Sequence, residues 1–412
     1  MRQFILILFA LTVGAASAVC DTCKRVSFSF PLSPQAEVCT YFFYGSMLDS
    51  LTVVLDDEGQ GSICFPNGYQ GYAQAVVNHA SLFEFIAGED GLRVESGDKQ
   101  PSAKNVFFPD SEENDFFFSM MKKKKENRQE RGWIEAGMEM GISHTPKLMQ
   151  ALQEASIENA KEATQVAKEI ESSPLYAARL IEINDFGESL FMAENQQNKE
   201  KIAYVKEYLS NRMDWEALYT SGQFWKMVHN YTLSMFNKED FSRPLHETQQ
   251  LYAGFIAPLL EKVDEPIRSA MLQSIINECE AFGWETAKTE VMEYVVDNNI
   301  MLDTSKPGIA RIMQGYKARA GTPPPSPLPG RGSKTILVFY DPGCDNCERA
   351  LQELEQNRAR LEGQGYQIIS ISSEDEGANE AFREYGIMAT PTFFVINENG
   401  VIDGRYTNLP QL

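Results

Sequence analysis

Basic residues and histidines are scarce in this chain of 412 residues. It has four histidines, and 37 lysines and arginines against 58 aspartates and glutamates, for a formal net charge of −21. Binding to nucleic acid requires clustered positive charge, so this balance argues against nucleic-acid partners. The one basic block, Lys122–Lys125, is followed by Glu126 and Glu130, a pattern typical of a solvated helix face.

Long apolar runs are also missing, except at the start of the chain. The opening MRQFILILFALTVGAASAVC has Arg2, an apolar core from Phe4 to Val13, and the small residues Ala16-Ser17-Ala18. This order is typical of a secretory signal peptide, and the run is too short to span a membrane. We therefore expect residues 1–18 to be removed, no transmembrane segment, and a mature protein in an exported compartment.

Cysteine is sparse, and its count of seven is odd. Disulfides persist in exported proteins, and an odd count leaves at least one cysteine that is free or bonds between chains. Cys39 and Cys64 lie in one predicted β region and could form a bridge, whereas Cys279 is expected to be a buried thiol in a helix. A lipid anchor on Cys20 is the weaker alternative, because Val19 is bulky where such sites normally have glycine or alanine.

Residues 19–118 have the pattern of a small antiparallel β domain of the sandwich type. VSFSF alternates, with Val26, Phe28 and Phe30 on one face, and SLTVVL is followed by the turn cluster DDEGQG. FEFIAGEDGLRVES repeats the order of strand, glycine-containing turn and strand.

Residues 119–320 predict an all-α domain of many short helices. Glycine and proline are sparse here, and tracts such as LMQALQEASIENAKEATQVAKEI have helical periodicity. Ser111 is a suitable N-cap for the first helix. The segment GTPPPSPLPG then has five prolines, so residues 321–332 predict a semi-rigid, extended linker.

Residues 333–412 alternate buried-strand and helix patterns. The apolar runs KTILVFY and YQIISIS flank a helical segment in which Leu351, Leu354 and Leu361 share a face. A second helix, EGANEAFREYG, precedes TPTFFVI and GVIDGRY, which NENG joins as a hairpin. This order predicts a parallel βαβ unit extended by antiparallel strands, which makes the whole chain an α+β multidomain protein.

Cys344 and Cys347 form a C-x-x-C pair between the strand KTILVFY and the helix that follows it. Unpaired N–H groups and the positive end of the helix dipole favour an anion at this position. A thiolate is such an anion, so we expect Cys344 to have a lowered pKa and to act as the nucleophile. Cys347, one turn further on, would be the resolving thiol.

Two other interpretations of this pair are a zinc site and a passive disulfide. Zinc needs four ligands, and the last module has no further cysteine or histidine. We therefore predict no metal site and no cofactor, while a passive disulfide stays open. The second pair, Cys20 and Cys23, would lie at a new N-terminus without a preceding buried strand, so we expect no catalysis there.

Thr390-Pro391 comes directly before the strand TFFVI. Proline cannot donate to a sheet ladder, so it is tolerated at the start of a strand. A cis bond here would place a tight corner beside the cysteine pair and leave backbone near Thr390 free to bind an extended peptide.

The motif FYDPGCDNC, with IMATPTFFVINENGVI downstream, resembles the thioredoxin-like thiol–disulfide oxidoreductases of the bacterial cell envelope. The resemblance covers residues 333–412 and implies a thioredoxin-like α/β domain in the periplasm or cell envelope. It implies that Cys344 attacks, that Cys347 resolves, and that Pro391 is the cis-proline beside them.

The motif departs from the family in three ways. The family often has tryptophan before the first cysteine, where this chain has DPG. Asp345 lies between the cysteines, and its carboxylate should raise the pKa of Cys344 and favour a reductant. The chain ends at TNLPQL where the fold usually has a further helix. The module could lack one covering element, or the helical domain could cover that face.

Two functions follow from these patterns. The first is an exported oxidoreductase that acts on protein disulfides as a reductant, with protein thiol partners and a membrane or soluble electron donor. The second is an envelope binding or scaffold protein in which the thioredoxin-like module, with a passive disulfide, serves recognition.

Overall fold

The computed structural model describes residues 23–140, 145–194, 199–234, 243–326 and 334–412. The predicted signal peptide and Cys20 lie outside these ranges, as do residues 327–332 of the predicted linker. Contacts between Cα atoms divide the chain into two compact units. One comprises residues 1–41 and 50–116, and the other comprises residues 42–49 and 117–412.

The N-terminal β region is built from two sheets, with strand orders β4-β1-β7 and β3-β2-β5-β6. Its elements are β1 (Lys24–Ser29), β2 (Glu37–Tyr44), β3 (Met47–Val54), β4 (Gln60–Phe65), η1 (Pro66–Gly68), β5 (Gly71–Val77), β6 (Ser81–Ala87) and β7 (Leu92–Glu95).

The two sheets share an aromatic core, as expected of a sandwich. The ring of Phe30 lies 6.2 Å from that of Phe83, and the ring of Phe65 lies 6.4 Å from that of Phe85. One strand pair differs from the predicted antiparallel pattern, because β7 runs parallel to β1. The long stretch of chain between these two strands allows the return crossing that parallel pairing requires.

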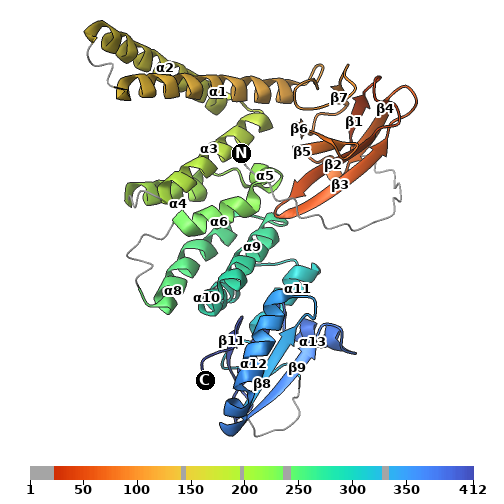
Figure 1. The fold of residues 1–412 in the computed structure, drawn as a ribbon, viewed down its shortest axis with the longest axis vertical. Coiled ribbons are helices and arrows are strands. Elements are labelled where there is room, and N and C mark those ends of the chain that lie inside the picture. Colours follow the sequence, from red (N-terminus) through yellow and green to blue (C-terminus); the bar gives the residue numbers. More distant parts are fainter. Residues whose placement is uncertain (1–22, 141–144, 195–198, 235–242, 327–333) are drawn as a thin grey trace. The chain divides into compact units, whose positions relative to one another are not determined.

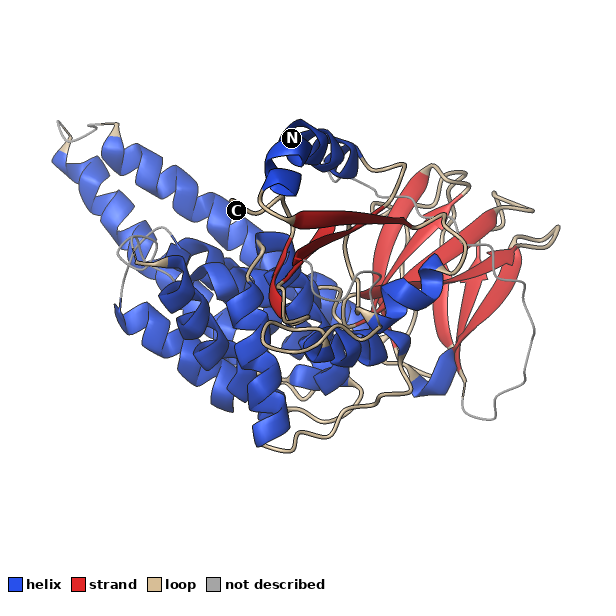
Figure 2. Cartoon of the chain, turned by 90° about the horizontal axis from the view of Figure 1, so that it is seen from below, coloured by secondary structure: helices blue, strands red, loops and turns tan. Residues whose placement is uncertain are grey.

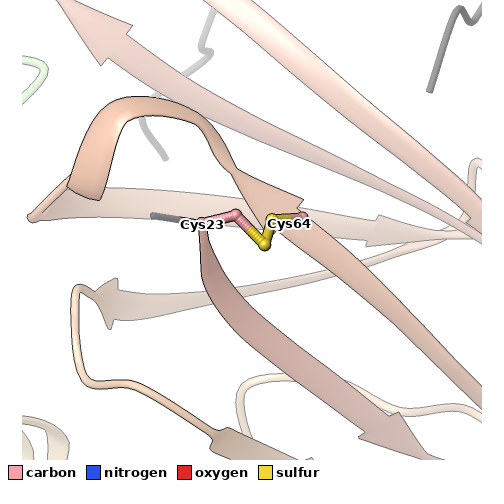
Figure 3. Close-up of a disulfide and its surroundings, with 2 residues drawn as sticks. All are labelled: Cys23 and Cys64. Carbon is pink, nitrogen blue, oxygen red and sulfur yellow. A yellow bond between two sulfur atoms is a disulfide. The ribbon is translucent and has the colours of Figure 1, made fainter. Parts of the chain in front are cut away.

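A disulfide joins Cys23, just before β1, to Cys64 on β4 (Figure 3). The bridge between Cys39 and Cys64 that the sequence left open is therefore not formed, and Cys39 is a free thiol. The physical reason is strand order: β1 pairs with β4, so the two Cα atoms of Cys23 and Cys64 are 5.5 Å apart. The bridge ties the chain just before β1 to the neighbouring strand β4.

Removing this disulfide should destabilise the β region. We expect Cys64→Ser to lower the free energy of unfolding by about 3 kcal/mol, because the bridge closes a long loop in the unfolded chain. Urea unfolding measures the change, with Cys39→Ser as the matched control that removes a free thiol. Equal losses in the two variants would contradict a stabilising role for the bridge.

Helices (blue in Figure 2) make up almost all of the regular structure between residues 112 and 317. They are α1 (Glu112–Glu139), α2 (Pro146–Ser172), α3 (Tyr176–Glu194), α4 (Lys199–Asn211), α5 (Trp215–Tyr219), α6 (Phe224–Ser234), α8 (Leu245–Ile256), η3 (Ala257–Lys262), α9 (Ile267–Phe282), α10 (Glu285–Asp297) and α11 (Pro307–Lys317). Ser111 caps α1 as predicted, because its hydroxyl accepts from the N–H of Asn114 at 3.2 Å.

The first two helices are long rather than short and lie side by side (Figure 1). Asn127 on α1 and Asn159 on α2 each donate a side-chain amide to the other's carbonyl, at 2.8 and 3.0 Å, which fixes their register. The basic block of α1 is not simply solvated. Lys123 pairs with Glu169 on α2 at 2.7 Å, and Lys124 pairs with an aspartate on α3.

The C-terminal region is a four-stranded sheet with the order β11-β10-β8-β9. Its elements are β8 (Lys334–Tyr340), α12 (Asp345–Gly363), β9 (Tyr366–Ser372), α13 (Ala378–Glu384), β10 (Thr392–Ile396) and β11 (Ile402–Tyr406). β8 and β9 are parallel, whereas β10 is antiparallel to β8 and β11, as the sequence predicts. The predicted fold class, a β region, a helical region and a C-terminal α/β domain, is confirmed.

Both faces of this sheet are covered. One face packs Ile336 and Val338 against α12, and Leu409 and Leu412 from the end of the chain join the same cluster. The other face packs Leu337 and Phe339 with apolar residues of α13 and with Ala318, which directly follows α11. The terminal segment thus contributes to the cover on the α12 face, while residues after α11 contribute to the cover on the opposite face.

A buried ion pair connects α9 to the sheet. Nη2 of Arg405 on β11 lies 2.9 Å from Oε1 of Glu280, and both side chains are at most 4% exposed. Nζ of Lys288 lies 2.9 Å from the same carboxylate oxygen. Burial raises the pKa of Glu280, but the charges of Arg405 and Lys288 outweigh it and hold that pKa below its ordinary value.

The start of the predicted linker is also attached to the sheet. The N–H of Gly321 donates to the carbonyl of Ile402 at 2.8 Å, and the N–H of Ile402 donates to the carbonyl of Thr322 at 2.9 Å. Nearby, a side chain at Gly386 would collide with the backbone of Gly315 on α11. The last helix of the helical region therefore packs directly on the C-terminal domain.

Replacing Glu280 by glutamine should remove the nearer counter-charge of buried Arg405 and leave the carboxylate of Glu285, 3.8 Å from its Nε. We expect the free energy of unfolding to fall by about 3 kcal/mol at neutral pH. Removing one partner of a buried ion pair leaves the other charge out of water without the attraction that compensated for its desolvation. The folded-state pKa is lowered, so this stability is present above the ordinary carboxyl pKa and is lost as pH falls through the folded value.

Urea unfolding at neutral and acidic pH measures the difference between the parent and Glu280→Gln, which should shrink in acid. Glu380→Gln is the matched control, since its pair with Arg383 is exposed and should be worth less than about 1 kcal/mol. A difference that grew in acid would contradict the assigned pairing.

Candidate active site

The candidate site lies where β8 ends and α12 begins. β8 is buried from Thr335 to Phe339, and Asp341-Pro342-Gly343 forms the turn after it. Cys344 is the N-cap residue of α12, with extended backbone, and Cys347 lies in the first turn of the helix. The carbonyl of Cys344 accepts from the N–H of Glu348 at 3.0 Å, which starts the helix.

The sulfur of Cys344 is placed to be a thiolate. It accepts the backbone N–H of Cys347 at 3.4 Å, so a helix N–H that would otherwise lack a partner points at it. Hydrogen bonds from Cys347, first from its side chain and then from its backbone, lower the pKa of Cys344 below its usual value. The side chain is half-buried and so remains accessible to a partner.

The sulfur of Cys347 has the opposite environment. Its side chain is fully buried, and burial raises the pKa of the Cys347 thiol. The backbone N–H of Asp341 donates to this sulfur at 3.5 Å. Within the pair, one thiol is therefore reachable and acidic, while the other is enclosed and stays protonated.

Thr390 and Pro391 lie beside the pair, as the sequence predicts. Their peptide bond is cis, and the carbonyl of Thr390 is 3.9 Å from the sulfur of Cys344, to which the thiol can donate. The structure therefore brings together residues that are far apart in the sequence, with the two cysteines and Thr390 in one place.

Comparison with known proteins agrees with this geometry. Residues 327–408 match the family described as thioredoxin-like domain. The C-terminal module is a thioredoxin-like domain. A solved structure, described as a thiol:disulfide interchange protein DsbE from Chlorobium tepidum, is 21% identical, with 19% of this chain and 71% of that chain covered and a TM-score of 0.17. A search of curated proteins found no match.

Asp341 is a site residue that the sequence patterns did not single out. Its carboxylate accepts the N–H of Gly343 at 3.1 Å, and its carbonyl accepts the N–H of Cys344 at 3.2 Å. The sequence did contain a signal for this role, an aspartate two residues before a glycine. In turns, an aspartate carboxylate commonly accepts the backbone N–H of the residue two positions later.

The other predicted groups have more limited roles here. Asp345 is exposed in the first turn of α12, so its predicted influence on Cys344 stays a prediction. In the exposed loop after β9, the carboxylate of Asp375 accepts the N–H of Ser372 at 2.7 Å and so shapes the turn. Cys279 is buried as predicted, and burial raises the pKa of its thiol.

Neither a metal centre nor a membrane span is evident among the described residues. In residues 23–140, 145–194, 199–234, 243–326 and 334–412, no group of three or more histidine, cysteine, aspartate and glutamate side chains could hold a metal ion. In the same ranges, no helix combines the length and apolar character that crossing a bilayer needs.

The two cysteines should differ in their reaction with an alkylating agent. We expect iodoacetamide to modify Cys344 first near neutral pH, because the thiolate reacts and the pKa of Cys344 is lowered while that of Cys347 is raised. Mass spectrometry of the reduced protein after short exposures at several pH values gives both rates. Equal rates at every pH would contradict the assigned roles.

Proposed function

We propose that the protein is an exported thiol–disulfide oxidoreductase that reduces disulfides of other proteins through Cys344 and Cys347. The observation that carries the proposal is the environment of the pair. A half-buried sulfur accepts a helix N–H, and its partner sulfur is enclosed one turn away. The thioredoxin-like fold supports the same class of reaction.

The reaction has two exchange steps. The thiolate of Cys344 attacks one sulfur of the partner's disulfide, which forms a mixed disulfide and releases the partner's other sulfur as a thiolate. Cys347 then loses its proton and attacks the sulfur of Cys344, which breaks the mixed disulfide and releases the second partner thiol. The partner gains two electrons and two protons, and Cys344 and Cys347 become a disulfide.

Three features favour this assignment over passive roles. Because the pKa of Cys344 is lowered and that of Cys347 is raised, the first attack on the partner's disulfide comes from Cys344 and not from Cys347. The carbonyl of Thr390 lies beside the sulfur of Cys344, where an extended segment of a partner protein would bind. The charge of Asp341 opposes the lowering of the Cys344 pKa, which offsets part of the stabilisation of the reduced form.

The compartment and the electron donor complete the proposal. The N-terminal signal-peptide pattern supports export to the periplasm or cell envelope, where protein disulfides are available. Each turnover leaves an oxidised pair, so a dithiol donor, either soluble or held in the membrane, must reduce it. The alternative is a scaffold protein whose pair is passive, and the same experiments separate the two.

Reduction of insulin by a dithiol donor should depend on Cys344. We expect Cys344→Ser to lose at least about a hundredfold in rate, because a serine hydroxyl does not exchange with disulfides at neutral pH. Cys347→Ser should retain the first step and accumulate a mixed disulfide on Cys344, which non-reducing gels and mass spectrometry detect.

Cys39→Ser is the matched control, because it removes another half-buried free thiol outside the site. Its rate should equal that of the parent. If Cys344→Ser reduced insulin as fast as the parent, the scaffold function would replace the enzymatic one.

A further inference from the structure

The turn before the cysteine pair is organised around one residue. Asp341 makes three hydrogen bonds in the site, one through its carboxylate and two through its backbone. Its carboxylate accepts from Gly343, its carbonyl accepts from Cys344, and its N–H donates to the sulfur of Cys347 at 3.5 Å. A single residue thus contacts the backbone of the attacking cysteine and the sulfur of the resolving one.

We infer that Asp341 is a positioning residue of the redox pair, which fixes the turn that presents Cys344 and supplies a negative charge that makes the dithiol a stronger reductant. The inference rests on the proposed function, and it concerns how that function is adjusted. The geometry alone gives the positioning role. The second role, the effect of the negative charge, follows because the carboxylate of Asp341 lies in the same four-residue turn as the sulfur of Cys344.

Electrostatics around the sulfur support the second role. The hydrogen bonds from Cys347 lower the pKa of Cys344, whereas the charge of Asp341 raises it. The other groups at this sulfur are the carbonyl of Thr390, the thiol and backbone N–H of Cys347, and the backbone N–H of Asn346, and none of them carries a formal charge. A less stable thiolate means a less stable reduced form, so the pair gives up electrons more readily.

The side chain of Asp341 is exposed, so its effect should be moderate. Water around an exposed charge weakens its influence on a neighbouring thiolate. Such a charge is also screened at high salt, whereas a hydrogen bond within the turn is not.

Two substitutions at Asp341 separate the charge from the turn. Asp341→Asn keeps an acceptor oxygen for Gly343 and removes the charge, and Asp341→Ala removes both. We expect both variants to lower the pKa of Cys344, more at low salt than at high salt. The pair should become a weaker reductant, with its equilibrium with glutathione shifted roughly threefold toward the reduced pair, or about 15 mV. Only Asp341→Ala should also slow insulin reduction, by about fivefold, because it loses the hydrogen bond that holds the turn.

Asp345→Asn is the matched control, because it removes the charge of a second exposed carboxylate, which lies in the first turn of α12. The inference holds if Asp341→Asn shifts the pKa and the potential more than Asp345→Asn does. It is overturned if Asp341→Asn leaves both unchanged, or if Asp345→Asn produces the larger shift.

A different result would contradict the proposed function itself. If the parent protein does not reduce insulin, the enzymatic proposal is wrong, whatever the Asp341 variants show. The thiol titration and the glutathione equilibrium need no protein substrate, so they decide the role of Asp341 independently.

Discussion

The candidate site depends on strand β8. Its side chains from Thr335 to Phe339 are buried, because they contribute to the cores on both faces of the sheet. A strand held in this way cannot shift by one residue without moving its apolar side chains to the wrong faces. The point at which the chain leaves the sheet is therefore fixed, and with it the position of Cys344 at the start of α12.

The different behaviour of the two cysteines follows from this position. At the N-cap, a sulfur meets backbone N–H groups that have no partner within the helix, so a thiolate is stabilised at Cys344. One turn later the helix carries Cys347 against the sheet, where burial favours the neutral thiol. The same short segment of backbone thus gives the two sulfurs opposite environments, which suit the proposed roles of nucleophile and resolving group.

Much of this site was predictable because its signals are local. The apolar run KTILVFY, the pair at the start of the helix and Thr390-Pro391 before TFFVI all gave correct positions. The sequence could not reveal features that depend on which distant elements become neighbours. The bridge between Cys23 and Cys64 requires that β1 pairs with β4, and the contact of Arg405 with Glu280 requires that α9 packs on β11.

The central claim is that Cys344 and Cys347 form a dithiol that exchanges electrons reversibly. The most direct measurement is the equilibrium of this pair with glutathione buffers of varied redox potential, read by alkylation and mass spectrometry of the peptide that contains both cysteines. We predict a single two-electron transition between about −270 and −120 mV, the span of thioredoxin-like proteins. A pair that remained fully reduced, or fully oxidised, across that whole range would contradict the account.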